Sequence, residues 1–108
     1  MISLPQGWSS LGTGLPSFNP AEGKLTDDKL QKLSENMLIA KSKNERLTLE
    51  IGWFPELSPD GLFKAILISE NDRERPIDIF WTRDLNDLIR WTQATLKWCV
   101  TITEKVFK

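Results

Sequence analysis

The chemistry open to this chain is limited first by the side chains that it lacks. It contains no His, the side chain whose unperturbed pKa lies nearest to neutral pH, so neither a His-based catalytic triad nor a histidine metal site can be built. Cys99 is its single cysteine, and it follows Trp98 at the end of an apolar helical pattern. We therefore expect Cys99 to be a small buried core residue rather than a nucleophile. No glycine-rich phosphate loop or calcium-loop spacing occurs either. The sequence thus predicts a non-enzyme that carries no metal or cofactor.

A run of acidic residues is the most informative charged feature. Between positions 70 and 87 there are six acids and three arginines, a local net charge of −3. These acids are Glu70, Asp72, Glu74, Asp78, Asp84 and Asp87. If they share one edge of the domain, their field would steer a basic partner towards it. The alternative, a solvated rim that only keeps the protein soluble, stays open.

Two tryptophans near the end of the chain are candidate anchors for a partner. Trp91 and Trp98 lie on a helical stripe beside Leu88 and Thr95, and aromatic side chains often carry most of the energy of an interface. The predicted partner-binding residues are the two tryptophans together with five of the acids: Glu70, Asp72, Glu74, Asp78, Asp84, Trp91 and Trp98.

The elements that must position these residues follow from hydrophobic periodicity. Apolar residues at steps of three and four predict helices over about 27–43 and 83–98, while alternation predicts strands over 47–54, 62–69 and 76–81. Residues 100–107 alternate more weakly and are read as a short final strand. Trp53 and Trp81 are in phase with aliphatic neighbours, so we expect both in the core. Short connections favour an antiparallel meander. The predicted fold is α+β, with an antiparallel sheet of three or four strands and helices packed on one face.

Length and composition set the remaining bounds. The chain has 108 residues, 40% of them hydrophobic and 27% charged, which is typical of one globular domain. We expect residues 1–24, rich in Pro and Gly, to form an irregular arm packed on a domain spanning 25–108. The formal net charge of −1 makes nucleic acid an improbable partner. There is no secretory signal pattern and no membrane-spanning run, so the expected location is the cytoplasm.

Three short motifs connect these elements. A strand ends in Gly52-Trp53-Phe54-Pro55, a hairpin carries Pro59-Asp60-Gly61, and Thr82-Arg83-Asp84-Leu85 leads into the apolar helix. In these features residues 47–98 resemble small immunity proteins of bacterial contact-dependent growth inhibition and polymorphic toxin systems. The resemblance implies a small cytoplasmic protein that occludes the active site of a cognate toxin domain, commonly a nuclease.

Two other functions remain open on the sequence. One is binding of single-stranded nucleic acid, with Trp and Phe side chains on an open sheet face stacking against bases. The other is a structural or regulatory subunit that forms a homodimer through its last helix.

Overall fold

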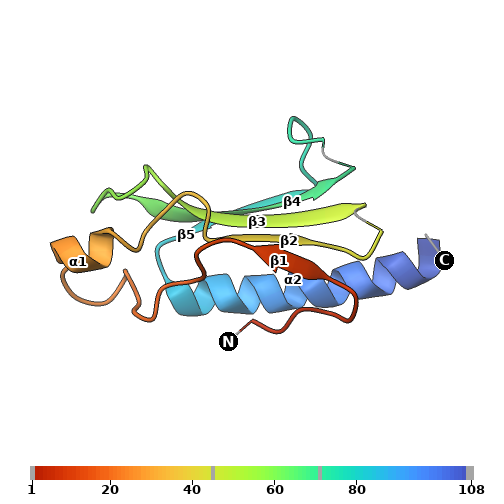
Figure 1. The fold of residues 1–108 in the computed structure, drawn as a ribbon, viewed down its shortest axis with the longest axis horizontal. Helices are drawn as coiled ribbons and strands as arrows, with labels where there is room; N and C mark the ends of the chain where they lie inside the picture. Colours follow the sequence, from red (N-terminus) through yellow and green to blue (C-terminus); the bar gives the residue numbers. More distant parts are fainter. Residues whose placement is uncertain (1, 45, 71, 107–108) are drawn as a thin grey trace.

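The computed structural model describes residues 2–44, 46–70 and 72–106, and it has an α+β fold (Figure 1). Five antiparallel strands form one sheet in the order β1-β2-β3-β4-β5. The strands are β1 (Ser9–Leu11), β2 (Leu38–Lys41), β3 (Leu47–Phe54), β4 (Leu62–Ser69) and β5 (Asp78–Thr82). The helices are α1 (Asp27–Leu30) and α2 (Leu85–Val106).

The central strands β3 and β4 coincide with the predicted strands 47–54 and 62–69, and the antiparallel meander is confirmed. Their register places Leu49 opposite Leu67 and Trp53 opposite Phe63, and all four side chains are buried. The Trp53 and Phe63 rings pack edge to face, with their centroids 5.1 Å apart. Because side chains alternate along a strand, this buried set defines one face of the sheet.

The long helix α2 covers that face from end to end (Figure 1). Leu85 and Leu88 join one buried cluster with Trp53 and Phe63, while Leu96 and Cys99 join a second with Leu49 and Leu67. The predicted core position of Cys99 is therefore confirmed. Of the two helices in the described part of the chain, α2 lies against the face, whereas α1 lies beyond the end of the strands (Figure 1). The expectation of several helices on one face is thus corrected to one.

The sheet has more strands than expected because residues 27–43 do not form a continuous helix. After Leu30 the chain makes tight i→i+3 hydrogen bonds, and residues 38–41 then pair with β3. The Met37 N–H donates to the Ile51 carbonyl, and the Trp53 N–H donates to the Ser34 carbonyl. Ser34 and Asn36 are weak helix formers. Leu33 and Met37 are buried, as the predicted helical stripe implies, but neither is in a helix. Instead, hydrogen bonds to Leu57 and Ile51 hold the chain there against the end of β3.

The other corrections lie at the two ends of the chain. A final strand over 100–107 is wrong, because α2 continues to Val106; residues 107 and 108 lie outside the described residues. Within the N-terminal arm, Ser9–Leu11 forms β1 against β2. Leu15 and Phe18 pack against one buried cluster, and Leu4 and Trp8 against the other.

Candidate protein-binding surface

Strand β5 forms one edge of the sheet. It pairs with β4, and no strand of the described residues pairs along its other side. An edge strand presents unpaired backbone groups that invite another strand to add to the sheet. One such group is engaged locally, because the Ile79 N–H donates to the Asp78 carboxylate at 2.9 Å.

Large apolar side chains are exposed along this edge. The exposed fractions are 44% for Ile77, 46% for Ile79 and 49% for Trp81. Ile79 and Trp81 face away from α2, because the intervening Phe80 stacks on Trp91 of the helix at 5.4 Å between ring centroids. We refer to Ile77, Ile79 and Trp81 as the β5 apolar surface. Ile77 lies on the side that faces α2, and Ile79 and Trp81 lie on the other, so both sides of this edge expose apolar area.

A groove of about 350 Å³ runs between β5 and α2. Asp78, Trp91 and Trp98 line it together with Ile77 and Thr95. The structure thus brings together three of the seven predicted partner-binding residues. Trp98 is 44% exposed, so an aromatic face lies open beside the edge strand.

The remaining acids do not line this groove. Glu70, Asp72 and Glu74 lie on the β4–β5 loop, which rises on the side of the sheet opposite α2 (Figure 1). All three are exposed, and Glu70, at a positive φ of 52°, pairs with Arg46 at 3.6 Å. They flank the start of β5 as a solvated acidic loop, separate from the two tryptophans.

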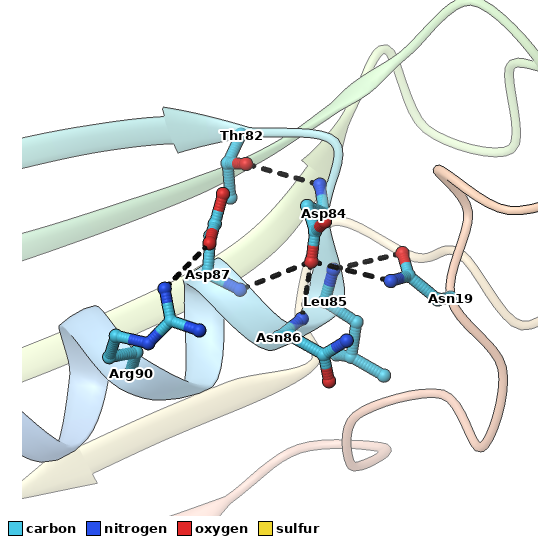
Figure 2. A network of polar contacts seen from close by, with 7 residues as sticks. All are labelled: Asn19, Thr82, Asp84, Leu85, Asn86, Asp87 and Arg90. Atoms are coloured by element: carbon cyan, nitrogen blue, oxygen red, sulfur yellow. Dashed lines mark hydrogen bonds and ion pairs between the residues drawn. The ribbon is translucent and has the colours of Figure 1, made fainter.

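Asp84 caps the start of α2 (Figure 2). Its Oδ1 accepts from the Asn86 and Asp87 N–H groups at 2.8 and 3.2 Å, and from the Asn19 side chain at 3.3 Å. These hydrogen bonds, above all that from the Asp87 backbone, hold the pKa of Asp84 below its ordinary value. The carboxylate therefore has a structural role that accounts for it fully: it satisfies orphan N–H groups at a helix N-terminus.

The residues that sequence reasoning missed are Ile77, Ile79 and Trp81. The expected core position of Trp81 is wrong, because its side chain is exposed at the sheet edge, whereas Trp53 is buried as expected. A signal was present, because Ile79, Phe80 and Trp81 are consecutive. Only one face of an edge strand packs on the helix, so the other face of such a run must meet solvent or a partner.

The three short motifs at positions 52–55, 59–61 and 82–85 have structural roles. The Trp53 indole N–H donates to the Ser58 carbonyl at 2.8 Å, and Arg83 donates to the Gly61 carbonyl at 2.9 Å while lying over the Trp53 ring. A Cβ at Gly61 would lie 2.3 Å from the Trp53 Nε1 atom. The hairpin therefore requires glycine there and holds the end of β3 against the start of α2.

The structure bears on two chemistries, a cysteine nucleophile and a metal site. Burial raises the pKa of the Cys99 thiol to about 11, so the thiolate needed of a nucleophile is disfavoured at neutral pH. Among residues 2–44, 46–70 and 72–106, no group of three acidic or cysteine side chains is placed to hold a metal ion. Neither helix of this part of the chain has the length and apolar character needed to cross a bilayer.

The arrangement is suited to binding: an apolar edge strand, an aromatic groove beside it and an acidic loop at its start. Comparison with protein-family models, with curated proteins and with solved structures gives no match.

Proposed function

We propose that this chain is a non-enzymatic binding protein that neutralises a cognate bacterial toxin domain by occluding its active site. The β5 apolar surface is the observation that carries the proposal. Four of the exposed large apolar side chains, Ile77, Ile79, Trp81 and Trp98, belong to one edge of the sheet and the groove beside it. Such concentrations on a small domain mark a surface that another protein covers.

The energetics of this surface suit a tight complex. Covering the exposed half of a tryptophan removes roughly 100 Å² of apolar area from water, which is worth about 2.5 kcal/mol. That is close to a hundredfold in affinity per anchor. Trp81 and Trp98 therefore supply the kind of energy that hot-spot residues contribute to an interface.

The acidic loop adds a preference for the partner's charge. Residues 70–78 hold four acids against Arg73 and Arg75, a net charge of −2, and a negative field of this kind accelerates association with a basic surface. A nuclease cleft that binds phosphates is basic. The resemblance of residues 47–98 to small immunity proteins therefore agrees with the charge of this loop.

The experiment takes the reading frame next to this gene and expresses its product alone and together with the chain; the proposal requires that this product is toxic when expressed alone. We expect the wild-type chain to restore growth and to bind the purified domain. The Ile79→Ser/Trp81→Ala variant should lose both properties while keeping its circular-dichroism spectrum. Ser17→Ala, at an exposed position in the N-terminal arm, is the control. Full protection by the double variant would refute the role of this surface.

Binding of single-stranded nucleic acid is the second candidate, and one observation favours it. On the face away from α2, the Lys64 ammonium lies over the rings of Trp81 and Phe54, at 5.3 and 5.6 Å from their centroids. Aromatic rings beside a cation can stack bases and meet phosphates. Titrating tryptophan fluorescence with a single-stranded oligonucleotide tests this candidate, since salt-sensitive quenching is required of it.

A homodimer through the last helix is the remaining alternative. The exposed Trp98 side chain would provide its contact. Sedimentation velocity at two concentrations separates it from the proposed function, because a chain that is monomeric at both has no such dimer.

A further inference from the structure

Strand β5 offers backbone hydrogen-bonding groups on its open side. Along an antiparallel strand, the N–H and C=O groups of every second residue point to the same side. The Ile79 N–H, which donates to the Asp78 carboxylate, belongs to the open side, and Trp81 lies two residues further along β5. The open side therefore presents the donors and acceptors of Ile79 and Trp81 to an incoming chain.

Apolar side chains lie on both sides of this row of backbone groups. On the side that faces α2, the groove of about 350 Å³ is lined by Leu67, Trp91 and Trp98 among others. On the other side, Ile79 and Trp81 are about half exposed. A helix satisfies its own backbone and would leave the groups of β5 unpaired. An added strand would pair with them, and its side chains would alternate between the two apolar sides.

The charges at the start of β5 select a cation on the incoming chain. Two acids nearby are already paired, Glu70 with Arg46 and Glu50 with Arg73. The charged side chains between positions 72 and 78 that form no ion pair in the described part of the chain are Asp72, Glu74, Arg75 and Asp78. Three carboxylates against one guanidinium leave a net charge of −2, which attracts a basic group.

We propose that a segment of the partner protein adds to β5 as an antiparallel sixth strand, with apolar side chains on both faces and Lys or Arg at its C-terminal end. Antiparallel pairing continues the pattern of the sheet and places that end beside the start of β5. Asp78 releases the Ile79 N–H to the new strand, and the cation pairs with the freed carboxylate.

The inference rests on the proposed function for the identity of the partner, and it adds the mode of binding. Main-chain hydrogen bonds to Ile79 and Trp81 supply affinity that does not depend on the partner's sequence. The groove and the β5 apolar surface each receive alternate side chains of the added strand, which supplies specificity.

The first test uses a peptide in place of the partner. The probe is a seven-residue peptide in which three valines alternate with two threonines and two lysines follow, acetylated and amidated at its ends. It is titrated into the full chain and followed by backbone-amide NMR. We expect saturable shifts at Ile79 and Trp81, with a Kd of about 1 mM. The absence of saturable shifts, or shifts centred on β1 instead, would overturn the proposal.

The matched control is the same peptide N-methylated at every valine and threonine. It keeps the side chains and the charge but donates no backbone hydrogen bond from these residues, so we expect it to bind at least tenfold more weakly. Equal binding of the two peptides would show that side chains alone hold them and would refute strand addition. A peptide with its lysines moved to the N-terminal end should bind about threefold more weakly, and equal binding would refute the antiparallel orientation.

Two variants of the chain test the charge preference. Asp72→Asn/Glu74→Gln removes two carboxylates beside the start of β5 and should weaken binding of the first peptide about threefold at low salt. Glu56→Gln/Asp60→Asn removes an equal charge at exposed positions of the β3–β4 turn and should bind like wild type. Equal affinities of the two variants would contradict a cation at the end of the added strand.

The product of the neighbouring reading frame separates this inference from the proposed function. In its complex with the chain, the Ile79 and Trp81 amides should exchange hydrogen at least tenfold more slowly than in the free chain. A complex that leaves their exchange unchanged would refute strand addition and leave the proposed function standing. Peptide binding at β5, together with a neighbouring product that is not toxic, would support strand addition and refute the proposed function.

Discussion

The two edges of the sheet are built differently. Strand β1 has three residues, two of them serines, and is followed at once by Gly12; so short an edge strand offers little backbone for further pairing. Strand β5 has five residues, and Ile79 and Trp81 stand exposed on its open face. This difference between the two edges supports the proposal that β5, rather than β1, meets the partner.

The largest expected effect is on the free energy of unfolding, and it distinguishes a residue on the packed side of β5 from one in β1. Phe80→Ala removes the ring that stacks on Trp91, and we expect a loss of about 3 kcal/mol in the free energy of unfolding. Leu11→Ala, at the most exposed large apolar side chain described, should change it by less than about 0.5 kcal/mol. Urea denaturation measures both. Similar losses at the two edges would contradict the difference drawn between them.

The next effect concerns the exposed side of β5. Trp81→Ala should weaken binding of the toxin domain by roughly 30- to 100-fold, because it removes an apolar anchor from the interface. Because the fold buries the other half of the side chain, the variant should also lose about 1–2 kcal/mol in the free energy of unfolding, so its circular-dichroism spectrum is checked before binding is measured. Isothermal titration calorimetry measures the affinity, with Leu11→Ala at the β1 edge as the matched control. An equal loss for Leu11→Ala would place the interface at both edges.

A smaller effect is expected from Asp78, which occupies the Ile79 N–H. Asp78→Ala frees this donor and removes a charge from the edge, so β5 becomes a better template for a second strand. We expect at least a tenfold increase in the self-association constant, measured by sedimentation equilibrium. Asp72→Ala removes a charge from the exposed loop and should leave self-association unchanged.

The smallest effect is a pH dependence at the turn that joins β5 to α2. The pKa of Asp84 is lowered in the folded chain, so the ionised carboxylate stabilises the fold above its unfolded pKa of about 3.9. This contribution is lost as the pH falls through the lower, folded pKa. Asp84→Asn should flatten the dependence of the unfolding temperature on pH below about 4, while Asp60→Asn, in the β3–β4 turn, should not. Identical profiles for wild type and Asp84→Asn would exclude the cap as its source.

The sequence predicted the parts of the fold in which local pattern and tertiary packing agree. Strands β3 and β4 alternate or run apolar between clear turn residues, and their predicted bounds match the structure. Residues 27–43 carry an equally regular apolar spacing, yet only Asp27–Leu30 is helical. Leu33 and Met37 needed burial, and a turn followed by a strand against β3 provided it.

The sequence also predicted some of the residues of the candidate site. Asp78, Trp91 and Trp98 were predicted, and the groove brings them together. Arg73 donates a hydrogen bond to Glu50, which lies 23 residues away in the sequence, and no local pattern predicts this contact. The β5 apolar surface was missed because period-two alternation shows that a strand has an apolar face but not which side is covered.

The sequence by itself determined the composition of this protein's chemistry: no histidine, one cysteine, an acidic segment and five tryptophans. These are properties of side chains and hold in any fold. Only the tertiary structure decided which of them meet and which strand forms an open edge. The physical reason is that exposure and hydrogen bonding between distant segments depend on how β3, β4, β5 and α2 pack, and short-range periodicity carries no record of that packing.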